Sequence, residues 1–149
     1  MNGKATFGLL LTVSALLMGM LLGGQIWVFC DVLSCLLVVG VTMGLLVLTH
    51  GLPATVTSLF GGLGRLIMPG RFAPWMPEES KAAANVASSA IRFALLSAVL
   101  AGLISFVAML QKLNDPTEIG PAVAVMMLSA FYALTMIALW FLPITRRFS

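Results

Sequence analysis

The sequence predicts an all-α integral membrane protein with four transmembrane helices, cytoplasmic N- and C-termini, and a short cytoplasmic segment between the second and third helices. The chain is 60% hydrophobic and only 9% charged, whereas soluble domains carry about 25% charged residues. Its mean hydropathy is +1.09. Because this number of charged residues is too small for a surface exposed to water, we expect the chain to lie in a lipid membrane. The net charge of +3 requires no nucleic-acid partner, because membrane topology accounts for it.

The four spans follow from uncharged stretches that can each hold a helix of about 20 mostly apolar residues. Turn-forming residues separate these stretches at 23–25, 50–53 and 114–116. In the last of these, Asp-Pro favours a turn and disfavours a preceding helical residue. The chain is therefore one membrane domain, with predicted spans at residues 5–24, 32–50, 91–111 and 119–143.

Lysine and arginine set the predicted orientation, because cytoplasmic loops carry an excess of both. With both termini inside, only Lys112 lies outside. A competing interpretation makes residues 1–24 a cleaved signal peptide; Lys4 and the apolar run fit it, but no small-x-small cleavage site is well placed. The cytoplasmic basic residues would be Lys4, Arg65, Arg71, Lys81, Arg92, Arg146 and Arg147.

The segment at residues 51–90 is the only sizeable piece predicted outside the membrane. Residues 55–68 have apolar side chains at helical spacing and a polar side, which predicts a helix in the membrane interface. Trp75 suits the headgroup layer. Pro77, followed by two glutamates, predicts a helix start that continues into the third span. The segment is too short for much of a core, and no nucleophile–base pair is present, so no enzyme is expected.

Several residues at the span ends have predicted roles. Asp31 is expected to cap the second span, or alternatively to lie near an ion entrance on the outer face. His50 is expected to be an interface residue rather than a proton relay. Pro121 is expected at the first helical position of the fourth span, where its missing N–H has no partner anyway. Cys30 and Cys35 are predicted free thiols, because their spacing does not match a metal site.

Polar chemistry inside the third and fourth spans is limited to hydroxyl groups. These hydroxyls can bond to the backbone or bridge helices, or they can line a path for a small ion. A proton path normally needs a carboxylate or histidine at membrane depth, and this chain has none there, so a partner would have to supply it. The hydroxyls belong to Ser97, Ser105, Ser129, Tyr132 and Thr135.

Small residues four apart favour close helix packing and an oligomeric assembly. Such pairs are frequent by chance in apolar helices that are rich in glycine. The three pairs are Gly19 and Gly23, Gly40 and Gly44, and Ala98 and Gly102.

Two stretches resemble the MotA family of bacterial flagellar stator subunits, within the wider MotA/TolQ/ExbB group of ion-driven motors. They are LLGGQIWVFCDVLSCLLVVG (21–40) and FVAMLQKLNDPTEIGPAVAVMMLSAFYALTMIALWFLPI (106–144). The nearer likeness is to the sodium-type branch, PomA. The resemblance implies a homopentamer in the bacterial inner membrane around a dimeric, MotB- or ExbD-like single-span partner. An aspartate in the span of that partner would supply the missing carboxylate.

The resemblance also assigns the expected ion pathway. The family's threonine in the third span falls on Gly102, and its pair in the fourth span falls on Ser129 and Ala130. Ser105 and Tyr132 lie near this path, and Pro121 would shape the helix beside it. Because two of the three hydroxyls are missing and Na⁺ needs several oxygen ligands, H⁺ is favoured over Na⁺ as the transported ion. No other cofactor is expected.

Two further departures limit the implied function. The family's large cytoplasmic domain, which pushes the flagellar rotor, is replaced by residues 51–90, so a standard flagellar torque generator is not expected. The family's proline near the start of the third span has no counterpart in residues 90–97. The alternative is therefore a structural or regulatory membrane scaffold that keeps the stator architecture without conducting ions.

Overall fold

The structure, a computed structural model, describes residues 3–24, 26–68, 75–111 and 116–148. Every element in these ranges is a helix. In chain order they are α1 (Gly3–Leu22), the 3₁₀-helix η1 (Ile26–Phe29), α2 (Val32–His50), α3 (Leu52–Ile67), α4 (Pro77–Leu110), α5 (Pro116–Met136), the π-helix η2 (Ile137–Phe141) and α6 (Leu142–Phe148).

Three helices are long and apolar enough to cross a membrane. This agrees with the expectation of a helical membrane protein. They cover Ile26–His50, Pro77–Leu110 and Ile119–Phe148. The apolar stretch Phe7–Leu22 in α1 is shorter. Large apolar side chains are exposed along all four segments, as expected for helices that face lipid.

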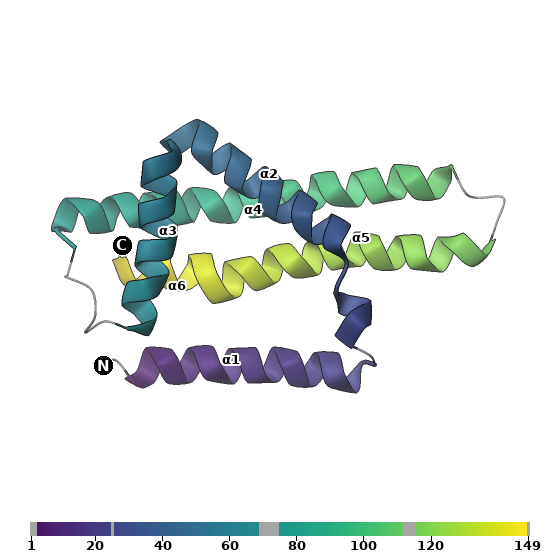
Figure 1. The fold of residues 1–149 in the computed structure, drawn as a ribbon, viewed down its shortest axis with the longest axis horizontal. Coiled ribbons are helices and arrows are strands. Elements are labelled where there is room, and N and C mark those ends of the chain that lie inside the picture. Colours follow the sequence, from purple (N-terminus) through teal and green to yellow (C-terminus); the bar gives the residue numbers. More distant parts are fainter. Residues whose placement is uncertain (1–2, 25, 69–74, 112–115, 149) are drawn as a thin grey trace.

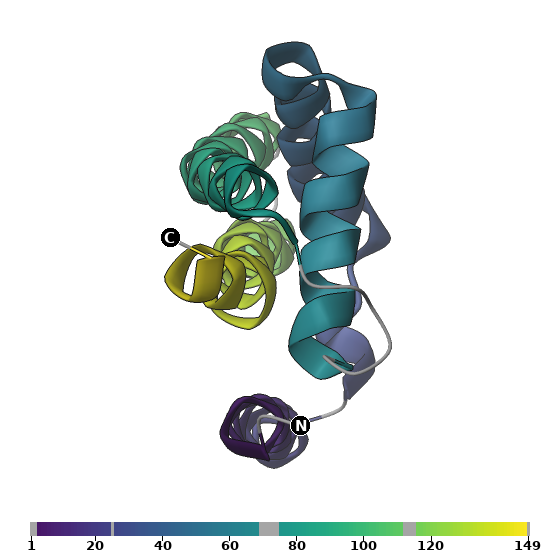
Figure 2. The same cartoon turned by 90° about the vertical axis from the view of Figure 1, so that its left-hand side faces the viewer.

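The helices form two layers with α1 beside them. Helix α4 and the continuous helix α5–η2–α6 lie side by side, and α2 and α3 pack across one side of this pair (Figures 1 and 2). Helix α1 lies apart from α2 and α4, and its contacts are with α3, η1 and η2. The hydrophobic core therefore forms between α2, α3, α4 and the C-terminal helix.

Both ends of the chain lie at the same end of the bundle, together with α3 and the start of α4 (Figure 1). The junction between η1 and α2 and the end of α4 lie toward the opposite end. Of the predicted turn at residues 114–116, residues 114 and 115 lie outside the described residues, as do Arg71 and Lys112, and Pro116 is the first residue of α5.

Helix α2 has the predicted bounds, and local chemistry explains both of its ends. The Asp31 carboxylate accepts a hydrogen bond from the backbone N–H of Ser34 at 3.1 Å and one from the Ser34 hydroxyl, so the predicted N-cap is confirmed. At the other end, Gly51 has φ +79°, a conformation that glycine adopts at little cost. Pro53 then lies in the first turn of α3.

Helix α4 begins at Pro77, as predicted, and runs without a break into the third apolar segment. The carboxylate of Glu79 accepts a hydrogen bond from the backbone N–H of Met76 at 3.0 Å. Its 34 residues span roughly 50 Å at 1.5 Å per residue. About 30 Å crosses the hydrocarbon core of a bilayer, so α4 is longer than a single crossing requires.

The predicted position of Pro121 is wrong. Helix α5 starts at Pro116, and Pro121 lies inside it. Pro116 occupies the first turn, where a missing N–H costs nothing. Pro121 is five residues further on, so one helical hydrogen bond to the carbonyl of Thr117 is lost.

The C-terminal helix continues past the predicted end at residue 143 through a π-turn. The N–H of Leu142 donates to the carbonyl of Ile137, five residues earlier. A proline within an α-helix clashes with the carbonyl four residues before it, and the wider turn directly precedes Pro143. The Trp140 indole N–H donates to the carbonyl of Leu59 at 3.1 Å, and this bond fixes the π-turn to α3.

Within the described part of the chain, helices pack closely at Gly62 and along the alanines of α4, whereas the predicted pair Gly40 and Gly44 has no close neighbour. A Cβ atom added at Gly40 or Gly44 would meet no heavy atom within 4 Å, so no helix of the same chain packs tightly there. A Cβ at Gly62 would lie 3.1 to 3.3 Å from three side-chain atoms of Ile144. The buried face of α4 is lined instead with alanines, among them Ala83, Ala87, Ala90, Ala94 and Ala101.

Candidate functional site

An open groove of about 460 Å³ runs between α4 and α5. All of its lining residues are apolar, and four are small, so the two helices present a surface on which another helix can pack closely. The lining consists of Leu95, Ala98, Val99, Gly102, Leu103, Phe106, Met126, Ala130, Ala133 and Leu134.

Two of the predicted pathway residues, Gly102 and Ala130, meet in this groove. Ala130 is exposed, and a Cβ added at Gly102 would lie 3.5 Å from Cγ of Met126. That distance is an ordinary van der Waals contact, so the groove is narrow but not closed at this point. Neither residue brings a polar side-chain atom into it.

Ser129 lies outside the groove, although it adjoins Ala130 in the sequence. Neighbouring residues on a helix point about 100° apart, and Ser129 is fully buried. Its hydroxyl donates to the carbonyl of Val125 at 3.2 Å, and the hydroxyl of Ser34 on α2 approaches the same carbonyl at 3.5 Å. Ser129 therefore packs toward α2 in this chain.

Tyr132 joins α5 to the start of α2. Its hydroxyl oxygen accepts the backbone N–H of Asp31 at 2.8 Å, and its O–H donates to the carbonyl of Phe29. Asp31 in turn caps α2 through Ser34. The two residues that were predicted separately, as an outer entrance and as part of a pathway, thus belong to one hydrogen-bonded cluster.

Three further hydroxyls of the apolar helices, those of Thr42, Ser97 and Ser105, are also paired within the chain. Ser105 donates to the carbonyl of Ala101 at 3.1 Å. Thr42 and Ser97 form a buried hydrogen bond of 2.8 Å between α2 and α4. Sequence reasoning missed Thr42, although a threonine in the middle of an apolar span is a signal for such a bridge.

No group of three His, Cys, Asp or Glu side chains among the described residues is placed to hold a metal ion. Cys30 and Cys35 are free and exposed, as predicted. The groove between α4 and α5 presents shape and apolar surface.

Replacing Tyr132 with phenylalanine is expected to lower the free energy of unfolding by about 1–3 kcal/mol, because the N–H of Asp31 and the carbonyl of Phe29 lose their partner. Unfolding in mixed detergent micelles, followed by circular dichroism, measures the change. Thr49→Val is the matched control, since the exposed Thr49 hydroxyl bonds only to its own helix. Equal effects of the two substitutions would contradict a tie between α2 and α5.

Comparison of the chain with models of known protein families and with curated proteins finds no match.

Proposed function

We propose that this chain is the A-type subunit of a MotA-like, ion-driven motor in a bacterial inner membrane. In the assembly, four spans place both termini in the cytoplasm, with α1 as the first span. Five copies surround a dimeric, single-span B-type partner. The proposal rests on the resemblance of residues 21–40 and 106–144 to the MotA/TolQ/ExbB group.

The groove between α4 and α5 is the observation that carries this proposal. In stators of the family, the third and fourth spans face the partner, and here the same two helices leave an apolar furrow open. The small side chains of Ala98, Gly102 and Ala130 would allow a helix to approach closely. A single transmembrane helix of the partner is the occupant that fits this surface.

The distribution of charge supports the orientation. Helix α6, which carries Arg146 and Arg147, lies at the end of the bundle that holds both termini, the C-terminal half of α3 and the first turns of α4 (Figure 1). Arg65 lies in the C-terminal half of α3, and Lys81 lies in the first turns of α4. The positive-inside rule assigns this end to the cytoplasm.

The chemistry of the groove supports H⁺ as the transported ion. Its lining offers no side-chain oxygen, whereas a hard cation such as Na⁺ requires several oxygen ligands. A proton needs one carboxylate and a hydrogen-bonded route, and the aspartate of the partner would provide the carboxylate. The residues around it would exclude water and hold the partner helix in place.

The cytoplasmic segment supports a role other than flagellar torque generation. Helix α3 packs on α4 and α6, and Trp140 and Ile144 anchor it there. It forms part of the bundle rather than an arm for pushing a rotor. Work would be delivered through the periplasmic part of the partner, or through a cytoplasmic protein that docks on residues 51–90.

A non-conducting scaffold is the second candidate function, and the placement of Ser129 favours it. The one hydroxyl retained from the family's three positions is fully buried and bonds to Val125 of its own helix. A scaffold would use the same groove to bind a partner without passing ions.

Purification of the tagged chain from its own membrane, followed by native mass spectrometry, tests the proposed assembly. The expected result is five copies of the chain with two copies of a single-span protein that has an aspartate within its span. A stable homo-oligomer that contains no such partner would contradict both the motor and the partner-binding scaffold.

A further inference from the structure

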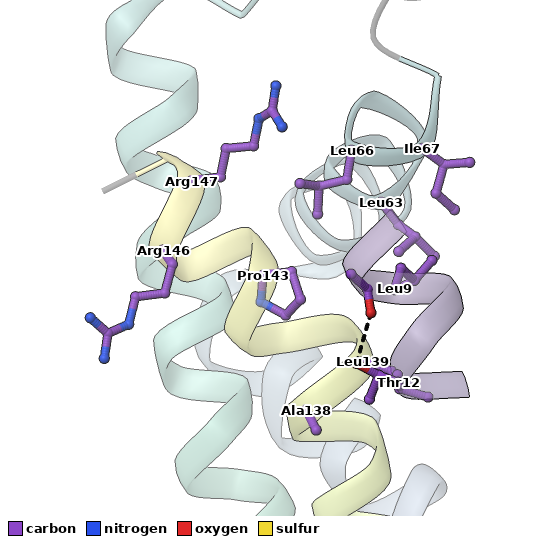
Figure 3. A pocket seen from close by; sticks show the side chains of 11 residues that line it. Leu9, Thr12, Leu63, Leu66, Ile67, Ala138, Leu139, Pro143, Arg146 and Arg147 are labelled. Atoms are coloured by element: carbon purple, nitrogen blue, oxygen red, sulfur yellow. Dashed lines mark hydrogen bonds between the residues drawn. The ribbon is translucent and has the colours of Figure 1, made fainter. Parts of the chain in front are cut away.

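A second cavity, of about 490 Å³, lies between α1, α3 and the C-terminal end of the α5–α6 helix. Leu9 of α1, Leu63 and Leu66 of α3, and Leu139 and Pro143 of the C-terminal helix form its apolar walls (Figure 3). A volume of this size falls within the range of small-molecule sites, about 300–1,000 Å³. The cavity is separate from the groove between α4 and α5.

The charge at this cavity has one sign. Arg146 and Arg147 belong to its lining, and none of the lining residues is acidic. Arg147 extends from α6 on the side of α3, whereas Arg146 extends toward the other side of α6 (Figure 3). The hydroxyl of Thr12 donates to the carbonyl of Gly8 at 2.8 Å, so its proton is already engaged within α1. The cavity thus combines an apolar interior with a cationic edge.

Aromatic contacts place this edge at the depth of lipid headgroups. The Arg65 guanidinium lies 4.3 Å from the centre of the Trp75 ring, and the same ring lies 4.9 Å from that of Phe148. Tryptophan is enriched at the boundary between headgroups and acyl chains. Phe148 directly follows the two arginines of α6, so this end of α6 belongs to the same layer.

We infer that this cavity binds one anionic phospholipid. An acyl chain occupies the apolar interior between α1, α3 and Leu139, and the phosphate binds the guanidinium of Arg147. Guanidinium groups form strong, bidentate hydrogen bonds with phosphate, and basic pockets between helices on the cytoplasmic side suit anionic headgroups. The net negative charge of the headgroup complements the cationic edge of the cavity, whereas the ammonium group of phosphatidylcholine opposes it.

The lipid would occupy the gap between α1 and the rest of the bundle. Helix α1 has few other contacts with the chain, namely with α3, η1 and η2. A bound acyl chain would therefore add apolar contact for Leu9 where the protein supplies little. This role does not depend on ion conduction, and it goes beyond the proposed motor function.

Native mass spectrometry of the full-length chain in detergent, titrated with phosphatidylglycerol or phosphatidylcholine, tests the charge requirement. Phosphatidylglycerol is expected to bind, whereas phosphatidylcholine is expected to bind only weakly. Arg147→Ala is expected to weaken phosphatidylglycerol binding by about tenfold, the effect of losing one charged hydrogen bond. Arg92→Ala is the control, because Arg92 is exposed on α4 outside the cavity. Equal losses in the two variants would overturn the proposal.

A second pair of variants tests the apolar interior. Gly8 lines the cavity, and a Cβ there meets no heavy atom within 4 Å, so the side chain of Gly8→Phe can enter the space that the acyl chain would occupy. It is expected to abolish lipid binding although both arginines remain. Gly19→Phe lies on the same helix in equally open space, outside the cavity, and is expected to bind lipid normally. Full binding by Gly8→Phe would overturn the proposal, because surface charge alone would then explain it.

Discussion

Replacing Gly62 with leucine is expected to lower the free energy of unfolding by about 3 kcal/mol, at the upper end of typical overpacking costs. The first added carbon would lie 3.1, 3.3 and 3.3 Å from three atoms of Ile144. Ile144 is fully buried, so its side chain cannot move aside into open space. Helix α3 would have to separate from α6, which also strains the hydrogen bond between Trp140 and Leu59.

Unfolding in mixed micelles, followed by tryptophan fluorescence, measures this loss. Gly44→Leu is the matched control, since a Cβ at Gly44 meets nothing within 4 Å. Leucine is favoured over glycine in a helix by about 0.8 kcal/mol, so this control is expected to be neutral or slightly stabilising. Ile144→Ala in the Gly62→Leu background is expected to recover part of the stability, because the two sites are coupled. Equal effects at Gly62 and Gly44 would contradict the packing of α3 on α6.

Filling the groove between α4 and α5 is expected to remove the partner without unfolding the chain. Ala130→Phe and Gly102→Phe each place an aromatic ring where the single-span helix would pack. Recovery of the partner in a tagged purification is expected to fall at least tenfold, which corresponds to about 1.4 kcal/mol of binding free energy. The amount of partner per copy of this chain, measured by quantitative mass spectrometry, is the readout.

Two substitutions serve as controls for this prediction. Gly102→Ala is expected to retain the partner, because its Cβ would lie at an ordinary 3.5 Å from Met126. Ala124→Phe adds the same ring to an exposed position of α5 outside the groove, and it is also expected to retain the partner. Wild-type recovery with Ala130→Phe would mean that the partner binds elsewhere.

Local signals in the sequence were sufficient to predict the end of a helix where a single residue type determines the backbone conformation. Asp31 and Gly51 mark the two ends of α2, and the bounds of that helix agree with the prediction. Pro77 and the glutamates after it mark the start of α4. Caps and prolines act within one turn of helix, so their effect can be recognised without knowledge of the neighbouring helices.

Features that depend on packing between helices could not be predicted. Pro116 and Pro121 were each compatible with the first turn of α5. Because the helix starts at Pro116, Pro121 lies inside it. Small residues four apart were evident at Gly40 and Gly44, yet the close contact forms at Gly62, because Ile144 lies opposite it. The sequence does not show which glycine another helix will meet.

The candidate pathway illustrates the same limit. Gly102 and Ala130 come together in the groove, but Ser129 packs toward α2 and Tyr132 holds the junction of η1 and α2. Helical geometry made it predictable that residues 129 and 130 would face different ways. It did not determine which of them faces the groove, because that depends on where α2 packs.

Proton flux into liposomes that contain the purified complex of this chain with its single-span partner tests the central claim most directly. Under an inside-negative potential, a pH-sensitive dye is expected to report acidification of the interior in the presence or absence of Na⁺. The flux is expected to disappear when the partner's intramembrane aspartate is changed to asparagine. A correctly assembled complex with no flux above that of empty liposomes would contradict the motor, and it would favour the scaffold.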